Sequence, residues 1–547
     1  MKRTSLLIVG LLGGLTAVVL IALTYLGNQL FGFPFVPFDI FDWMARHLPG
    51  GWINFVIATM VKVITALRLG PTASTAKLAE QTIALVQFAI LGILIGLILW
   101  IIGRRRPDKL VLSGMLAGAV VCAGIIFIET TLQYPSSAGM LTLGWLALIF
   151  LGWAAVLGRL IRELAIQPLP SPQLDLNLPK QDELSRRQFL YLVGAGSFAI
   201  MVSAAGFKIF HLTGPLPSAS QSVPTPDLGS LLPSSGAASS PEQSALAARF
   251  VPVPGTRPEL TPNDQFYRID IDTTPPEVNG DTWRLDFVGL VDKPLSLSLA
   301  DLKSRRAISQ AITLECISNE VGGDLISTSI WTGVPLKDLI AEAGLKPGVQ
   351  EIAISTADGF YESVPIIEAL DERTLLVYQM NYQPLPVEHG FPLRIYIPNH
   401  YGMKQPKWIT RMQAIDHEGA GYWIDRGWSA TAFVQTTSVV DSVAVDQKGP
   451  QTGVIPTGGI AYAGSQGISK VEIQVDDGPW EAGELRDPPL SPLTWVQWRY
   501  AWKSSPGRHT VQVRAYNGEG VLQVTNPHIT LPNGATGIDS VTTDVIS

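Results

Sequence analysis

The chain has 547 residues, a formal net charge of −7, charged residues at only 16% and a mean hydropathy of +0.25. This composition excludes an ordinary soluble protein, and it offers no strongly basic surface, so no nucleic-acid partner is expected. Only two cysteines, Cys122 and Cys316, are present, which excludes a disulfide scaffold. Covalent haem and iron–sulfur motifs are missing, so neither cofactor is expected in this chain.

Five segments are apolar over the roughly 20 residues that a membrane-spanning helix requires. They are residues 5–26, 82–103, 110–128, 140–161 and 189–207. The flanking basic residues are Lys2, Arg3, Arg104, Arg105, Arg106, Lys109, Arg159, Arg162, Lys180, Arg186 and Arg187. All of them are cytoplasmic if the N-terminus is inside, as the positive-inside rule requires. The sequence therefore predicts a multi-pass protein of the lipid bilayer, with everything after residue 207 outside the cytoplasm.

Residues 52–69 are also apolar, but Lys62 and Arg68 interrupt them. Counting this segment as a sixth span would place the arginine cluster at 104–106 outside. We interpret it as an interfacial or re-entrant helix.

The segment before the last span contains Arg186 and Arg187, followed by Phe189 and Leu190. It resembles a twin-arginine export signal placed internally, which is typical of bacterial or archaeal cell membranes and of proteins exported in folded form. The alternative is a basic pair that only marks the cytoplasmic end of a helix. We expect the span to be kept as an anchor, although a small-residue cleavage site near Ala204 is an alternative.

The composition of the chain changes along its length and predicts five regions. These are a transmembrane helical region of about four spans plus the interfacial helix at 1–165, a cytoplasmic segment and anchor at 166–210, a Pro/Ser-rich linker at 211–250, a mixed α+β domain at 251–435, and an antiparallel β-sandwich with a tail at 436–547. Strand patterns occur at 283–290, 351–355, 374–379, 393–397, 469–475, 495–502 and 509–515, and helix patterns at 299–304, 336–343 and 366–370.

Cys316 has no second cysteine in the predicted exported part of the chain. An exposed thiol there would be open to oxidation. Cys316 is therefore expected either to be buried as a small hydrophobe or to be held by a metal.

The motifs that follow resemble the sulfite oxidase superfamily of molybdopterin enzymes. The matching segments are 261–268, 281–285, 313–319, 331–336, 385–386, 389–394, 401–404 and 407–408, with 467–472 and 532–537 in the sandwich. The resemblance covers about half of the chain. It implies an α+β cofactor domain followed by an immunoglobulin-like domain, which often serves for dimerisation, so a homodimer is possible.

The resemblance further implies a molybdenum–molybdopterin cofactor, with Cys316 as the thiolate ligand of the metal. The residues implied in cofactor binding are Asn263, Tyr267, Arg268, Cys316, Thr356, His389, Arg394, Lys404 and Lys407. Each also has an ordinary structural interpretation: a surface ion pair for Arg394, a strand position for Thr356, and turn chemistry for His389. Tyr361 falls where the family places an active-site tyrosine, or else it packs in a strand core. Cys316, Tyr361 and Arg268 are the residues expected to act in catalysis.

The sequence departs from the family pattern directly after Cys316. Sulfite oxidases follow the cysteine with an asparagine and two arginines that help bind sulfite, whereas this chain has Asn319, Glu320 and Val321. An acid and an apolar residue disfavour a small dianion. Arg268, Lys404 or His400 are candidates to compensate, but an uncharged substrate such as a sulfoxide is at least as plausible as sulfite.

These observations predict a membrane-anchored oxidoreductase that transfers an oxygen atom outside the cytoplasm, with two electrons exchanged. The electron partner is expected to be a separate carrier, either a cytochrome or a membrane redox protein. Two alternatives are a cofactor-free relative that acts as a binding module and a thiol hydrolase that uses Cys316 with His389 or His400. The substrate, the reaction direction, the oligomeric state and the role of the first four spans are left open.

Overall fold

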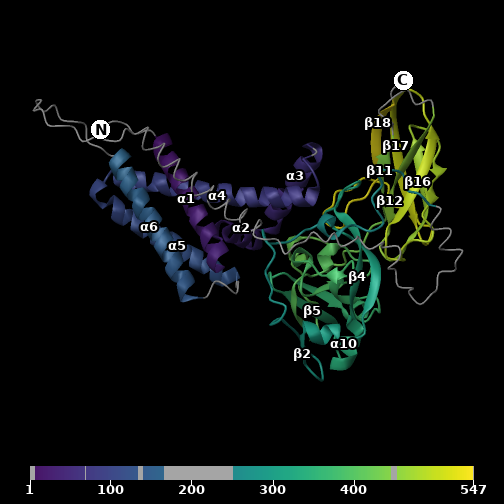
Figure 1. Cartoon of the computed structure of the whole chain (residues 1–547), viewed down its shortest axis with the longest axis horizontal. Helices are drawn as coiled ribbons and strands as arrows, with labels where there is room; N and C mark the ends of the chain where they lie inside the picture. Colours follow the sequence, from purple (N-terminus) through teal and green to yellow (C-terminus); the bar gives the residue numbers. More distant parts are fainter. Residues whose placement is uncertain (1–5, 68, 133–138, 166–249, 445–452, 546–547) are drawn as a thin grey trace, which may run out of the picture. The chain divides into compact units, whose positions relative to one another are not determined.

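The computed structural model describes residues 6–67, 69–132, 139–165, 250–444 and 453–545. The chain divides into two compact units, a helical unit of residues 1–48 and 77–232 and a sheet-rich unit of residues 49–76 and 233–547 (Figure 1). The anchor and twin-arginine segment expected at 166–210, and all but the last residue of the linker expected at 211–250, lie outside the described residues.

The helical unit contains the first four expected spans. Its helices are α1 (Leu6–Phe31), α2 (Val36–His47), α4 (Thr72–Gly103), α5 (Leu110–Leu132) and α6 (Met140–Ala165), with the short η1 (Pro107–Lys109) before α5; the first residues of α4 belong to the sheet-rich unit. Five helices of the described chain are long and apolar enough to cross a membrane, and they include α3 (Gly50–Leu67) as well as the four expected spans. Length and composition therefore permit the predicted crossings.

Glycines bring the long helices of this unit unusually close together. A Cβ on Gly114 of α5 would lie 2.3 Å from the carbonyl oxygen of Ala154 in α6, and one on Gly158 would lie 2.6 Å from that of Leu110. A Cβ on Gly13 of α1 would lie 2.4 Å from the carbonyl oxygen of Gly92 in α4. Small residues at helix contacts are typical of packing in a bilayer, where close backbone approach replaces the hydrophobic effect.

The sheet-rich unit begins with two five-stranded sheets. The first has the order β2 (Leu295–Ser298), β1 (Arg284–Gly289), β10 (Ile409–Ile415), β5 (Glu351–Thr356) and β6 (Tyr361–Pro365). The second contains β3 (Ile308–Glu315), β4 (Ile326–Pro335), β7 (Leu375–Met380) and β8 (Gln383–Pro384), with β9 (Arg394–Tyr396) also paired to β7. Among these pairs β1 and β10 are parallel, and the rest are antiparallel. Short helices connect the strands: α9 (Leu299–Lys303), α10 (Leu336–Ala343), α11 (Ile366–Ala369), η2 (Asn263–Gln265), η3 (Val387–His389), η4 (Gly402–Lys404) and η5 (Ile424–Arg426).

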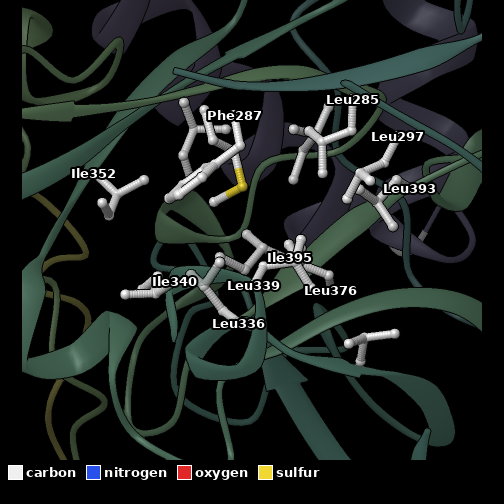
Figure 2. Packing of buried hydrophobic residues seen from close by; sticks show 14 of the residues in the cluster. Leu285, Phe287, Leu297, Leu336, Leu339, Ile340, Ile352, Leu376, Leu393 and Ile395 are labelled. Carbon is white, nitrogen blue, oxygen red and sulfur yellow. The ribbon is translucent and has the colours of Figure 1, made fainter. Parts of the chain in front are cut away.

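One hydrophobic core joins the two sheets and α10. Figure 2 shows Phe287 of β1, Leu339 of α10 and Leu376 of β7 within it, all with no exposed surface. Every residue of β4 is buried, so this strand lacks the alternation of a half-exposed strand. Burying each of these large side chains contributes about 1.5–3 kcal/mol, which makes the sheets a firm support for the loops at their ends.

The C-terminal part consists of two four-stranded antiparallel sheets. One has the order β11 (Thr437–Val443), β12 (Val454–Tyr462), β16 (Val496–Lys503) and β15 (Glu484–Leu485). The other has the order β14 (Glu481–Ala482), β13 (Ile468–Val475), β17 (Gly507–Asn517) and β18 (Asp539–Val545). Their inward-facing side chains share a core around Trp498, Val471 and Val513. The strands expected from the sequence are present, and the immunoglobulin-like assignment stays a prediction.

Helix α3 packs with the sheet-rich unit. The Asn54 side chain accepts a hydrogen bond from Trp428 Nε1 (3.0 Å) and donates one to the carbonyl oxygen of Arg426 (2.7 Å). Beyond the other end of α3, the backbone N–H of Thr72 donates to Asp324 Oδ2 (2.8 Å). The sequence grouped this helix with the membrane region at 1–165, and its packing against residues near 324 and 428 was not anticipated.

Candidate active site

Cys316 follows directly after β3 and is buried, with 8% of its surface exposed. Its backbone N–H donates to the Leu325 carbonyl (2.9 Å), and its Sγ lies 3.1 Å from Ser318 Oγ. Burial raises the pKa of the Cys316 thiol, because the thiolate loses hydration in an apolar environment. A metal cation bound to the sulfur would reverse this effect and hold the thiolate form.

The segment 316–325, here called the cysteine loop, is held by a network of hydrogen bonds. Asn319 donates to Glu315 Oε1 (2.9 Å) and accepts from the backbone N–H of Leu325 (2.9 Å). Arg257 Nη2 donates to the Gly323 carbonyl (2.9 Å). A Cβ on Gly323 would lie 2.4 Å from Asn319 Oδ1, so this position needs glycine. The loop is therefore fixed in shape before any ligand binds.

Four side chains of the predicted site gather in a second group, here called the basic cluster: Arg268, His389, Arg394 and Lys407. Asp270 accepts hydrogen bonds from both Arg268 Nε and Lys407 Nζ. Arg394 Nη1 donates to the His389 carbonyl (3.3 Å), and its guanidinium lies 4.7 Å from the centre of the Trp331 ring. Burial lowers the pKa of Arg394 to about 10 and lowers that of Lys407, although Asp270 opposes the change at Lys407.

His389 is neutral within this cluster. It is 97% buried, and burial together with the charges of Lys407 and Arg394 lowers its pKa to about 3. Nε2 donates to the Asn263 carbonyl (3.1 Å), an acceptor that fixes the proton on this nitrogen. Phe266 contacts the imidazole edge to face, with 5.3 Å between ring centres.

Cys316 and the basic cluster are neighbours. Tyr267 interacts electrostatically with both: burial raises the pKa of its phenol, Cys316 raises it further, and Arg394 acts in the opposite direction. Asn263 joins the same region through Asn381, whose Nδ2 donates to Asn263 Oδ1 (2.9 Å). Seven predicted residues thus lie in one continuous region.

Three predicted residues have partners of their own in the described structure. Thr356 donates from Oγ1 to the Phe360 carbonyl (2.8 Å) and also contacts Asp358. Lys404 is buried and donates to Glu362 Oε1 (2.7 Å). Tyr361 donates from its hydroxyl to Asp425 Oδ2 (2.6 Å). Their roles toward a cofactor or substrate stay predictions.

Comparisons with known proteins identify the family of the chain. The family described as "Oxidoreductase molybdopterin binding domain" matches residues 272–423. The Bacillus subtilis protein named "Uncharacterized oxidoreductase YuiH" is 32% identical over 146 residues, which cover 27% of this chain and 72% of that protein. This chain belongs to the sulfite oxidase-type family of molybdopterin oxidoreductases.

Two further proteins are similar to parts of this chain. Mitochondrial sulfite oxidase of Rattus norvegicus is 29% identical over 287 residues, which cover 45% of this chain and 52% of that protein. The chain therefore spans about half the length of this sulfite oxidase and of those of Mus musculus and Homo sapiens. The sulfane dehydrogenase SoxCD from Paracoccus pantotrophus has 21% identity and a TM-score of 0.47, with 54% of this chain and 87% of that chain covered.

The residues present fit the cofactor that a molybdopterin oxidoreductase implies. The Nη2 atom of Arg268 is buried without a hydrogen-bond partner, which suits an anionic group beside the basic cluster. In the part of the chain that the structure describes, no group of three or more His, Cys, Asp or Glu side chains is placed to hold a metal ion. A metal bound to Cys316 would complete its coordination with sulfur ligands of the pterin, which suit a soft, redox-active metal.

Sequence reasoning missed the acidic partners of the site. Asp270 pairs with two basic residues, and Glu315 lies beside Cys316 with its pKa raised by burial to about 7. Glu315 had a visible signal, because an acid at the end of the apolar run 311–316 is unusual inside a sheet. Asp270 is two residues from Arg268, but its second partner Lys407 is 137 residues away in the sequence and gave no signal.

Proposed function

We propose that this protein is a membrane-anchored, molybdopterin-dependent oxidoreductase that catalyses two-electron oxygen-atom transfer on a small or sulfur-containing substrate outside the cytoplasm. The observation that carries the proposal is the buried Cys316 at the end of β3, together with a basic cluster in which Arg268 keeps a buried Nη2 without a hydrogen-bond partner.

The chemistry of each predicted site residue suggests its role in binding the metal, the pterin or the substrate. Cys316 supplies a soft thiolate ligand, and the hydrogen bonds of the cysteine loop hold its sulfur in place. Arg268, Arg394 and Lys407 neutralise the phosphate of the pterin, and Asn263 and neutral His389 pair with its polar edges. Thr356 and Lys404 are proposed as further residues of this pterin-binding site. When bound, the molybdenum centre exchanges two electrons and an oxygen atom with the substrate. Tyr361 is proposed to line the substrate side.

The position of α3 supports the proposed topology. Its N-terminal half contacts residues 426 and 428, and the residue that opens α4 contacts Asp324, all in the sheet-rich unit. A helix cannot cross a bilayer while both of its ends touch the same extramembrane unit. We therefore propose that α3 lies outside the membrane on the same side as the rest of the sheet-rich unit, which agrees with the proposed crossings at α1, α4, α5, α6 and 189–207.

The substrate is proposed to be uncharged. Glu320 and Val321 occupy the positions where sulfite oxidases carry arginines, and an acid there disfavours a dianion. A sulfoxide, or the thioether from which it forms, meets this condition. Electrons are proposed to pass to or from a separate carrier, a cytochrome or a membrane redox protein, and the sandwich is proposed as a dimer contact.

The two cysteines of the chain provide the test. The full-length protein is purified in detergent from a host that makes molybdopterin, as wild type, Cys316→Ser and Cys122→Ser. We expect about one molybdenum and one pterin per chain in the wild type and in Cys122→Ser, because Cys122 lies in the helical unit. Cys316→Ser is expected to lose at least 90% of the molybdenum.

Two results would contradict the proposal. A wild-type protein without molybdenum or pterin would favour the cofactor-free binding module. Full molybdenum content in Cys316→Ser would remove the proposed metal ligand. A hydrolytic activity that alkylation of Cys316 abolishes in the metal-free protein would instead support the thiol hydrolase.

A further inference from the structure

A pocket of about 360 Å³ lies between α3 and the cysteine loop, both parts of the sheet-rich unit. Its lining on the helix side comes from Val61, Ile64, Thr65, Gly70 and Thr72, and on the loop side from the whole of 318–325. A volume of this size accommodates a small organic molecule.

The pocket adjoins Cys316 through residues of the cysteine loop. Ser318 lines the pocket, and its Oγ lies 3.1 Å from Cys316 Sγ. Asn319 also lines it and donates its backbone N–H to the Cys316 carbonyl (2.9 Å). A molecule bound here therefore touches the loop that carries the proposed metal ligand.

The walls of the pocket are apolar where α3 faces the loop. Val61 and Ile64 are buried at 8% and 3% exposure, whereas their neighbour Val63 is 45% exposed on the same helix. Val321 adds an apolar side chain from the loop. The hydroxyl of Thr65 is engaged within the helix, donating to the Val61 carbonyl (2.9 Å).

The charges at the pocket are acidic. Glu320 and Asp324 are the charged side chains among its described lining residues, and no described lysine or arginine lines it. The backbone N–H of Thr72 satisfies one oxygen of Asp324 but cancels no charge. The two lining carboxylates disfavour an anion and exert no net charge attraction or repulsion on a neutral molecule.

We propose that this pocket is the route by which substrate approaches Cys316, that α3 forms its outer wall, and that it admits uncharged, partly apolar molecules while excluding anions. The inference rests on the proposed function for the identity of the molecule as substrate. The selectivity of the pocket itself can be measured without the cofactor.

Two threonines of α3 offer a matched pair of reporter positions. Both side chains are exposed, but only Thr65 lines the pocket. Each donates its hydroxyl to the carbonyl four residues earlier and is three residues from Lys62. Arg68, three residues after Thr65, has no counterpart near Thr59 apart from Lys62, and it would favour an anionic reagent at position 65, against the expected preference. Thr65→Cys and Thr59→Cys are made in the full-length protein, and the unsubstituted protein gives the background from the native cysteines. Alkylation rates are measured with uncharged N-ethylmaleimide and with a sulfonated, anionic maleimide.

The pocket predicts a distinct charge preference at position 65. The ratio of the alkylation rate with N-ethylmaleimide to the rate with the anionic maleimide is expected to be at least tenfold larger for Thr65→Cys than for Thr59→Cys. Adding Val321→Arg to Thr65→Cys is expected to reduce that ratio at least threefold. Methyl phenyl sulfoxide at millimolar concentration is expected to slow alkylation at position 65 only. Equal ratios at the two positions, or no protection by the sulfoxide, would overturn the inference.

A second measurement separates this inference from the proposed function. The molybdenum-loaded protein is assayed for reduction of methyl phenyl sulfoxide, in which the S–O bond breaks, two protons and two electrons from reduced viologen are consumed, and water leaves. Ile64→Trp fills the pocket and is expected to raise KM at least fivefold with unchanged molybdenum content and little change in kcat. An unchanged KM in an active, loaded Ile64→Trp enzyme overturns the pocket alone, whereas an unloaded wild type overturns the proposed function.

Discussion

At the scale of single residues, His389 couples the site to pH. Its pKa is about 3 in the folded protein, against an ordinary value of 6.5. Below pH 6.5 the His389 side chain is protonated in the unfolded chain but not in the folded chain. The contribution of His389 to the free energy of unfolding is therefore complete above pH 6.5 and decreases as the pH falls toward 3. At pH 5 the loss is about 2 kcal/mol.

His389→Gln keeps a side-chain N–H donor for the Asn263 carbonyl but does not titrate. Between pH 7.5 and pH 5, the variant is expected to lose about 2 kcal/mol less unfolding free energy than the wild type. Denaturant unfolding followed by tryptophan fluorescence checks this, with exposed His528→Gln as the control. Equal acid sensitivity of wild type and His389→Gln would show that His389 is protonated in the folded state.

The ion pair between Lys404 and Glu362 gives a second prediction. Their side chains are 5% and 0% exposed, and burial raises the pKa of Glu362 while Lys404 lowers it. Lys404→Met leaves a buried carboxylate without a cation and is expected to cost about 3–5 kcal/mol of unfolding free energy. Adding Glu362→Gln is expected to restore most of this loss.

A surface pair serves as the comparison. Lys337→Met breaks the contact with Glu372, whose side chain is 61% exposed, and is expected to change stability by less than about 1 kcal/mol. Thermal unfolding of the four proteins distinguishes the cases. A Lys404→Met protein as stable as Lys337→Met would mean that water or a ligand reaches Glu362.

At the scale of elements, the close pairing of β11 and β12 depends on Gly459. A Cβ there would lie 1.9 Å from the Val439 carbonyl oxygen and 2.9 Å from the Trp498 ring. Gly459→Ala is therefore expected to destabilise the sandwich by about 1–3 kcal/mol. Gly453→Ala, where nothing lies within 4 Å of the added carbon, is expected to have little effect in the same thermal unfolding measurement.

Local sequence patterns predicted many elements and few of their contacts. Strands β1, β5 and β7 were predicted because their apolar residues recur over short segments between turn residues. The assignment of Cys316 as a metal ligand rests on its flanking motifs and stays a prediction. The pairing of Asp270 with Lys407 could not be predicted, because a charge in sequence does not reveal a partner 137 residues away. Helix α3 was predicted as a helix, but apolar periodicity does not distinguish a lipid surface from a protein surface.

At the scale of the whole molecule, Asn54 ties an early helix to a late loop. Its side chain bonds both the Trp428 indole and the Arg426 carbonyl. Asn54→Ala removes both contacts and is expected to loosen α3, so that trypsin cleaves after exposed Lys62 several-fold faster. Thr59→Ala, on the exposed side of the same helix, is the control. An unchanged cleavage rate in Asn54→Ala would mean that the apolar contacts of Val61 and Ile64 hold the helix without Asn54.

The docking of α3 also has a consequence for how the protein is made. Asn54 leaves the ribosome 374 residues before Trp428, and Thr72 leaves it 252 residues before Asp324. On the proposed topology, α3 is at the outer surface of the membrane before the later spans insert and before its partners in the remaining chain are exported. A shortened protein that begins after residue 249 would contain the strands of both sheets but would lack α3, the proposed outer wall of the pocket. On this proposal the pocket forms only after the exported domain reaches the α3 helix that was synthesised before it.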